Sequence, residues 1–167
     1  MFRVMSLARL AIAASVLLAL VAITFGPAQA AASATCQSNF VVLTDPANPG
    51  DQVTHGQTTI VRDSGVLGSY QDGRLAGYAV NGVQDLVINN FTQRADINGT
   101  LTASSPDGGS SITLRYTGHA DLKSGHATGT FVVVAGTGQF ADDHMSGKIS
   151  AQLVGPVTFQ GVDIGLC

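Results

Sequence analysis

The sequence contains no glutamate, so any pair of carboxyl groups that exchanges protons in catalysis must consist of aspartates. This absence excludes a glutamate-based glycosidase. Charged residues are also few, with eight basic and eleven acidic residues and no cluster of lysine and arginine. Because binding to nucleic-acid phosphates requires such clusters, we expect no nucleic acid as a partner.

Other catalytic patterns are missing as well. No Gly-x-Ser-x-Gly nucleophile elbow is present, which argues against a serine hydrolase. Four histidines occur without a close two-residue ligand spacing, although His119 and His126 could face each other across a hairpin loop with Asp121 as a third ligand. Solvated loop histidines are the commoner outcome. We therefore expect no metal ion and no cofactor.

One long apolar run stands at the N-terminus. Arg3 and Arg9 precede it, LAIAASVLLALVAITF forms the run, and Ala28-Gln29-Ala30 follows, as in a secretory signal peptide. We predict cleavage after Ala30, export to the periplasm or the medium, and one domain over residues 31–167 without membrane contact. An uncleaved anchor is the alternative, but no basic stop-transfer flank follows the run.

The chain has only two cysteines, Cys36 and Cys167, close to the two ends of the expected mature chain. In an oxidising compartment this placement favours an intramolecular disulfide that joins the ends. Two unpaired thiols, or an intermolecular bond through Cys167, are the alternatives. If the bridge forms, neither cysteine is available for thiol catalysis.

From Asn39 onward there is no helical period. Short runs rich in Val, Ile, Thr and aromatic residues alternate with turn residues, and SSITLRYTG is the clearest case, with Ile112, Leu114 and Tyr116 on one face. The predicted strands are 39–44, 57–62, 65–71, 74–80, 85–91, 96–104, 110–118, 127–135, 145–154 and 157–163. Two of the early runs could form one bent strand or a loop.

This pattern is typical of an all-β fold, and because closure removes exposed sheet edges, a closed antiparallel barrel of about eight strands is preferred over a sandwich. Such a barrel is just wide enough to be filled by side chains or to hold one small ligand. Turn signals lie at Asp72-Gly73, Asn81-Gly82 and residues 106–109. Residues 44–57 form the longest irregular segment and a candidate lid.

The segment VVVAGTGQFADDHMSGKIS (residues 132–150) contains a Gly-x-Gly motif that could suggest a phosphate-binding loop. A phosphate-binding loop requires its glycines between a strand and a helix N-terminus, whereas here strand patterns stand on both sides. We therefore predict a β-hairpin connection at Gly136-Thr137-Gly138. We expect Phe140 to fold back as an apolar plug at one end of the barrel.

Three blocks resemble, in order, the dirigent and allene oxide cyclase superfamily: GRLAGYAV (73–80), INGTLT (97–102) and VVVAGTGQF (132–140). The resemblance spans residues 73 to about 153 and implies an eight-stranded antiparallel barrel, often a homotrimer, with a largely apolar pocket and no cofactor. Members steer the ring closure or radical coupling of a bound hydrophobic molecule, and others have no known activity.

The same resemblance suggests one catalytic residue. FVVLTD (40–45) is similar to the first strand of dirigent proteins, which ends in an aspartate, so Asp45 is the candidate acid or base. The chain has Thr44 where those proteins often have histidine. Its segment ADDHMSG (141–147) is longer than the family's and lacks the family's arginine.

Polar side chains that could orient a ligand in an apolar barrel are Arg62, Tyr70, Tyr78, Arg115 and Tyr116. Because neighbours on a strand alternate, Arg115 and Tyr116 cannot both point inward, and the apolar pattern favours Tyr116. The alternative is that the tyrosines belong to the core and the arginines point outward.

Two functions follow from these observations. In the first, an exported barrel binds a small apolar or aromatic molecule and guides its cyclisation or coupling, with Asp45 as acid or base and Tyr78 and Tyr116 orienting the ligand. In the second, the barrel is filled by its own side chains and the protein is a non-catalytic surface or structural module. A cavity near about 300 Å³ would favour the first function. The sequence leaves open whether any substrate is turned over.

Overall fold

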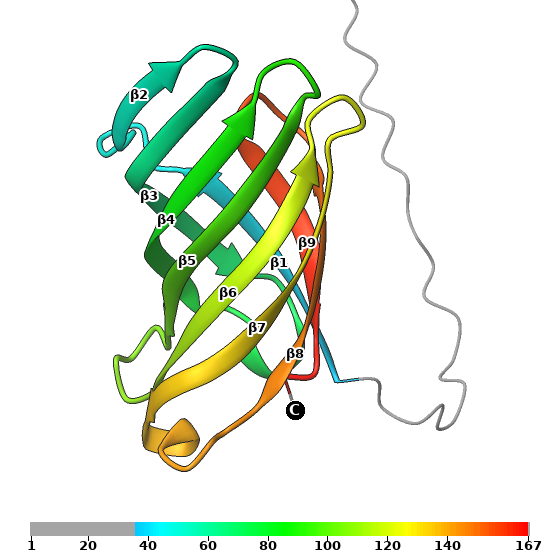
Figure 1. The fold of residues 1–167 in the computed structure, drawn as a ribbon. Helices are drawn as coiled ribbons and strands as arrows, with labels where there is room; N and C mark the ends of the chain where they lie inside the picture. Colours follow the sequence, from blue (N-terminus) through cyan, green and yellow to red (C-terminus); the bar gives the residue numbers. More distant parts are fainter. Residues whose placement is uncertain (1–35, 167) are drawn as a thin grey trace, which may run out of the picture. The chain divides into compact units, whose positions relative to one another are not determined.

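The computed structural model describes residues 36–166 (Figure 1). The predicted signal peptide, residues 1–30, lies outside the described residues. The strands are β1 (Gln37–Thr44), β2 (Asp51–His55), β3 (Thr58–Tyr70), β4 (Ala79–Asn89), β5 (Arg94–Ser104), β6 (Ser111–Asp121), β7 (His126–Thr137), β8 (Ser146–Leu153) and β9 (Thr158–Ile164). Two short 3-10 helices are η1 (Gly73–Leu75) and η2 (Gly138–Phe140). No helix among the described residues is long and apolar enough to cross a membrane.

The strands form one antiparallel sheet in the order β1-β9-β8-β7-β6-β5-β4-β3-β2, and a further pairing of β1 with β3 closes it. Eight strands make the closed barrel and β2 lies outside it, beside β3 (Figure 1). The prediction of an antiparallel barrel of about eight strands is confirmed, and the sandwich alternative is wrong.

Strand β3 covers two of the predicted runs, 57–62 and 65–71, in a single bent strand. The bend is a bulge between Val61 and Ser64, where Asp63 has a φ of 54°. Beyond the bulge β3 changes partner, since residues 66–70 pair with β1 and residues 58–62 pair with β2. The segment 44–57, predicted as an irregular lid, therefore contains strand β2, which extends the sheet.

The turn predicted at Asn81-Gly82 is wrong, because β4 passes straight through it. Gly82 pairs with Leu101 of β5, and a Cβ atom on Gly82 would lie 2.2 Å from the Thr100 carbonyl oxygen. Glycine at this position therefore permits a close approach of two strands. The predicted strand at 74–80 is replaced by η1 and the start of β4, whereas the turns at Asp72-Gly73 and at residues 106–109 are confirmed.

A plug of apolar side chains closes the end of the barrel at which β1 begins. Leu75 of η1 and Phe140 of η2 are fully buried, and Leu166 is almost so. The Phe140 ring packs edge-on against Tyr78, with ring centroids 5.8 Å apart. The predicted role of Phe140 is thus confirmed, and the plug joins the β3–β4 connection to the β7–β8 connection.

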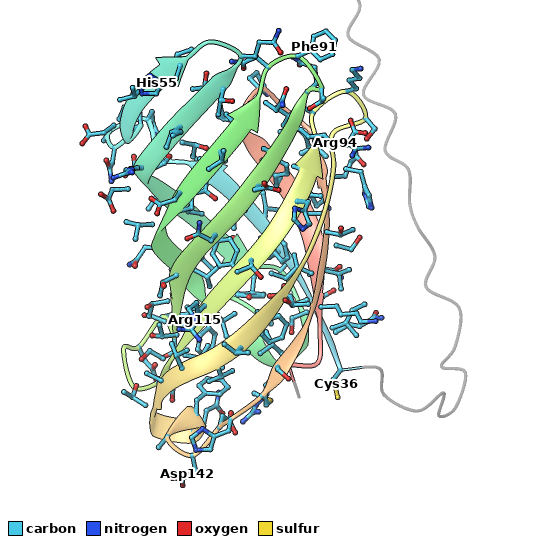
Figure 2. All side chains as sticks on the ribbon, viewed as in Figure 1. Cys36, His55, Phe91, Arg94, Arg115 and Asp142 are labelled. Atoms are coloured by element: carbon cyan, nitrogen blue, oxygen red, sulfur yellow. The ribbon has the colours of Figure 1, made fainter. Side chains whose placement is uncertain are left out.

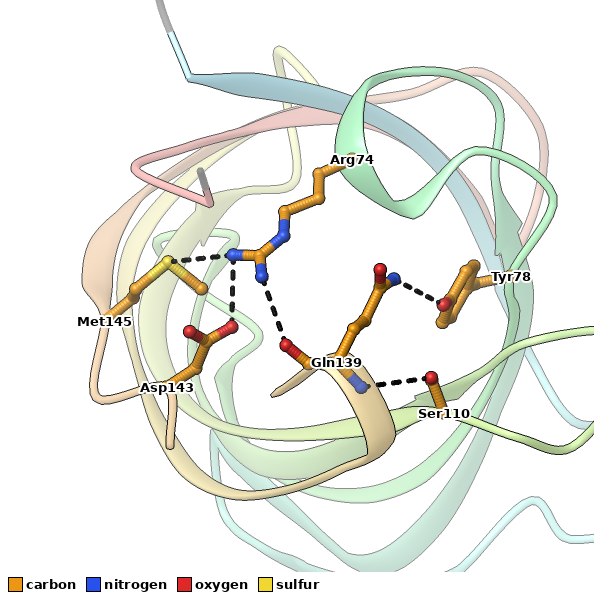
Figure 3. A network of polar contacts seen from close by, with 6 residues as sticks. All are labelled: Arg74, Tyr78, Ser110, Gln139, Asp143 and Met145. Atoms are coloured by element: carbon orange, nitrogen blue, oxygen red, sulfur yellow. Dashed lines mark hydrogen bonds and ion pairs between the residues drawn. The ribbon is translucent and has the colours of Figure 1, made fainter. Parts of the chain in front are cut away.

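Polar contacts made by Arg74 hold the plug in place (Figure 3). Its guanidinium lies 4.6 Å from the centre of the Phe140 ring and 3.0 Å from an oxygen of Asp143, and it donates a hydrogen bond to the Gln139 carbonyl. The segment 141–147 contains no arginine. The guanidinium that pairs with its Asp143 comes from Arg74 of η1.

The ends of the described chain lie side by side. The Gly165 amide donates a hydrogen bond of 2.7 Å to the Cys36 carbonyl, next to the buried side chain of Leu166. Cys167 lies outside the described residues, so the disulfide between Cys36 and Cys167 stays a prediction.

Replacing the plug aromatic should destabilise the barrel. We expect Phe140→Ala to lower the free energy of unfolding by about 3 to 5 kcal/mol, because it leaves a cavity in a fully buried site. Phe91 is 74% exposed in the loop between β4 and β5 (Figure 2), so Phe91→Ala is the matched control, expected within about 0.5 kcal/mol of the wild type. Urea unfolding followed by circular dichroism measures both, and equal effects would contradict the plug.

Candidate functional site in the barrel cavity

Beyond the plug, the interior of the barrel contains a cavity of about 110 Å³. Most of its lining is apolar, from all eight barrel strands; the residues include Phe40, Val42, Val66, Val80, Leu86, Ile97, Leu101, Leu114, Ala127, Ile149, Ala151 and Phe159. The plug residues Leu75 and Phe140 do not line it. The cavity therefore lies between the plug and the opposite end of the barrel.

Two inward-facing glycines help to leave this space open. Gly118 of β6 continues the inward series of Ile112 and Leu114, and it pairs with Gly129 of β7. A Cβ atom on Gly118 would lie 2.6 Å from the Thr128 carbonyl oxygen, so the strands approach too closely for a larger residue. At this pair of positions no side chain enters the interior of the barrel.

A carboxyl group and a phenol meet at the wall of the cavity. Asp163 of β9 and Tyr70 of β3 both line it, and their exposed fractions are only 3% and 2%. The Tyr70 hydroxyl donates a hydrogen bond to Oδ2 of Asp163. No lysine or arginine among residues 36–166 lines the cavity, so the Asp163 carboxyl has no cationic partner there.

Burial raises the pKa of both groups. Loss of hydration raises the pKa of Asp163 to about 7, and the hydrogen bond from Tyr70 opposes this rise in part. Burial, and then the nearby Asp163 carboxylate, raise the pKa of Tyr70 well above its usual value. Near neutral pH the cavity therefore contains a carboxyl group that is poised between its protonated and ionised forms, as in many functional sites.

A buried serine lies beside this pair. Ser38 of β1 is directly opposite Asp163 in the register between β1 and β9, so both side chains lie on the inner face of the sheet. Ser38 is fully buried, and its Oγ has no hydrogen-bond partner among the described residues. Gly73 packs closely against this serine, since a Cβ atom on Gly73 would lie 2.3 Å from the Ser38 Oγ.

Tyr116 supplies a second polar group to the cavity. It points inward from β6, as predicted, and its hydroxyl donates a hydrogen bond of 3.1 Å to Oε1 of Gln84. Burial raises the pKa of Tyr116, so it stays a neutral donor. Gly99 pairs with Tyr116, and a Cβ there would lie 2.7 Å from the hydroxyl oxygen, so glycine leaves room for the ring.

The other residues predicted from the sequence lie elsewhere. Tyr78 belongs to the plug, where its hydroxyl accepts a hydrogen bond of 2.9 Å from Gln139. Arg115 is exposed on the outer face of β6 (Figure 2), and Arg62 is exposed on β3 opposite Asp51. Asp45 does not line the cavity. Its carboxylate instead accepts a hydrogen bond of 2.9 Å from the Ala47 amide, in the turn that follows β1.

Sequence reasoning missed Asp163, Ser38 and Gln84. The one available signal was the position of Asp163 two residues after Gly161 and four after Phe159, on a face that carries an aromatic residue. The opposite face of β9 carries Val162 and Ile164, so both faces looked partly apolar and neither was identified as inward.

The histidines lie away from the cavity interior. The side chain of His119 is exposed on the outer face, where Nδ1 is 2.6 Å from Oδ1 of Asp96. Among residues 36–166 no group of three or more His, Cys, Asp or Glu side chains is arranged to hold a metal ion. His126 lies on β7 and faces outward as well.

No family model matches the sequence, and comparisons with curated proteins and with solved structures found no match. The resemblance to the dirigent and allene oxide cyclase superfamily therefore stays a prediction. The chemistry of the site follows from its own geometry: an apolar cavity with one buried carboxyl, two phenols and one amide.

The raised pKa of Asp163 makes stability depend on pH in a defined direction. Between the ordinary aspartate pKa near 4 and the folded value of about 7, the folded protein keeps a proton that the unfolded chain has lost. The Asp163 contribution to the free energy of unfolding is therefore present at low pH and falls as pH rises, by up to about 4 kcal/mol.

We expect Asp163→Asn to lack this fall, since the amide does not titrate. Exposed Asp142 at the plug end (Figure 2) provides the control, and Asp142→Asn should keep the fall. Urea unfolding of the three proteins from pH 4 to 8 measures it. The pKa values of Asp72, Asp107 and Asp121 are lowered, so these groups make the protein more stable as pH rises, in a more acidic range. All three proteins share this contribution, so it cancels when their stability curves are compared. Parallel curves for wild type and Asp163→Asn would show that this carboxyl titrates normally.

Proposed function

We propose that the protein is an exported barrel that binds a small apolar or aromatic molecule in this cavity without a cofactor. The observation that carries the proposal is the apolar cavity in the barrel interior, beside a core of buried aromatic and aliphatic side chains. Proteins fill their interiors densely, and a void costs stability unless something compensates for it. Ligand binding provides that compensation.

The cavity volume limits the size of the ligand. At about 110 Å³ it is smaller than the 300 Å³ expected for a typical ligand site and close to that of engineered cavities of about 150 Å³ that bind benzene. We therefore propose a ligand of about one ring. Larger hydrophobic molecules would require movement of the cavity walls.

The family resemblance adds a finer proposal, that the barrel holds its ligand in a conformation that favours ring closure or coupling. In that case Asp163, and not Asp45, is the proposed acid or base. Asp163 lines the cavity and has a carboxyl pKa of about 7, in the range that favours proton transfer near neutral pH. The Asp45 side chain instead accepts a hydrogen bond from a backbone amide in a turn outside the cavity.

The second candidate function is the non-catalytic module with a filled barrel. It is favoured by the small volume of the cavity and by the tight plug of Phe140, Leu75 and Leu166. The two functions differ in whether an apolar molecule of one ring enters the folded protein and stabilises it.

Filling the cavity should abolish binding. Ala127 of β7 lines the cavity, whereas Thr130 of the same strand is exposed on the outer face, so Ala127→Leu and Thr130→Leu are a matched pair. We expect toluene to raise the melting temperature of the wild type and of Thr130→Leu, since a ligand that binds only the folded state stabilises it. Ala127→Leu should show a loss of at least tenfold in affinity.

Ligand-observed NMR measures the affinity, and circular dichroism checks that Ala127→Leu is folded, because overpacking costs about 1 to 3 kcal/mol. Toluene that fails to bind the wild type would favour the filled, non-catalytic barrel. Equal binding to both variants would place the toluene site outside the cavity.

A further inference from the structure

We infer that the ligand is a neutral molecule with a hydrogen-bond-accepting oxygen, such as a ketone, and that Asp163 binds this oxygen as a donor. The inference rests on the proposed function and specifies the chemical class of its ligand. It follows from the hydrogen bonds and the charges around Asp163.

One carboxyl oxygen of Asp163 is occupied and the other is available. The Tyr70 hydroxyl engages Oδ2, which leaves Oδ1 for a ligand because Asp163 lines the cavity. A protonated carboxyl has one O–H donor, and with Oδ2 accepting from Tyr70 this proton belongs on Oδ1. The protonated carboxyl therefore offers one donor at the wall of the cavity.

The surroundings of Asp163 favour its neutral form. Asp163 lies opposite Ser38 of β1 and opposite Ile149 of β8, and it accepts a hydrogen bond from Tyr70 of β3. Within the described part of the chain, the other titratable group whose side chain faces the cavity is Tyr116, a neutral phenol bound to Gln84.

Charged groups near the cavity are engaged elsewhere. His119 contributes to the wall of the cavity, but its side chain is exposed and paired with Asp96. In the plug, Arg74 and Asp143 form an ion pair with each other. Lys148 of β8 is exposed on the outer face. Among residues 36–166, therefore, no cation is available inside the barrel to stabilise an Asp163 carboxylate, and the raised pKa of this group agrees with that environment.

The same environment disfavours charged ligands. A carboxylate ligand would add a second negative charge to a space without a cation. An amine could pair with ionised Asp163, but an ammonium has three donors, and most of the cavity lining is apolar. Burial of an incompletely paired ammonium is costly. A neutral acceptor requires only one donor, and the protonated carboxyl of Asp163 supplies one.

Three probes of similar size test the inference: cyclohexanone, methylcyclohexane and cyclohexylamine. Each is titrated by ligand-observed NMR against wild type, Asp163→Asn and Asp163→Leu at pH 5 and pH 8. Each probe is compared with itself across variants and pH, since the probes differ in hydration. Circular dichroism confirms that each variant is folded.

For cyclohexanone we expect wild-type affinity to be about tenfold weaker at pH 8 than at pH 5, because a carboxyl with a pKa of about 7 is then mostly ionised. Asp163→Asn keeps an N–H donor and should bind at both pH values alike. Asp163→Leu should lose about tenfold at pH 5. Methylcyclohexane should bind with no dependence on pH in the wild type and no loss in Asp163→Leu.

The outcomes separate this inference from the proposed function. Methylcyclohexane binding together with cyclohexanone affinity that is indifferent to pH and to Asp163→Leu would overturn the inference and leave the proposed function intact. Cyclohexylamine affinity that rises from pH 5 to pH 8 and is lost in Asp163→Asn would overturn it in favour of a cationic ligand. Failure of all three probes to bind would overturn both.

Discussion

Strand β1 closes the barrel, because it hydrogen-bonds to β9 along one edge and to β3 along the other. This closure creates an interior that side chains must fill. The bulge in β3 permits it, since β3 pairs with β1 on one side of the bulge and with β2 on the other. Because β1 and β3 are neighbours, Tyr70 at the end of β3 comes within hydrogen-bonding distance of Asp163 on β9.

The interior divides into two parts with different physical character. Near the start of β1 the aromatic plug and the Arg74 contacts make a dense core. Farther along, the paired glycines Gly118 and Gly129 leave a void whose walls are apolar. A carboxyl placed at such a void loses hydration without gaining a cation, so its proton is retained to higher pH. Asp163 is therefore both a cost to the fold and the most distinctive chemical group in the barrel.

Local patterns predicted the barrel and the plug well. Alternation over 110–118 placed Tyr116 inward, and the glycines before Phe140 indicated where the chain turns back. Local turn propensity failed at Asn81-Gly82, because pairing with β5 along the whole of β4 outweighs it. Strand β2 was missed for a related reason. Its five residues have no apolar alternation, and it forms by pairing with β3.

The candidate site was predicted only in part. Tyr70 and Tyr116 were selected by residue type, and both line the cavity. Asp163 was not selected. Its burial depends on Tyr70, which lies 93 residues earlier in the chain, and on which face of β9 points inward. Both are long-range properties that composition and spacing do not contain. The family resemblance directed attention to Asp45, which the fold places in a turn outside the cavity.

The assignment of Asp163 as a neutral donor depends on its protonation in the folded, ligand-free protein. A ¹³C NMR titration of the aspartate carboxyl resonances, assigned by comparison with Asp163→Asn, measures it directly. We expect a midpoint at about pH 7 for Asp163. A midpoint near pH 4, the ordinary value for an exposed aspartate, would mean that the carboxyl is hydrated, and it would contradict the neutral donor on which the ligand assignment rests.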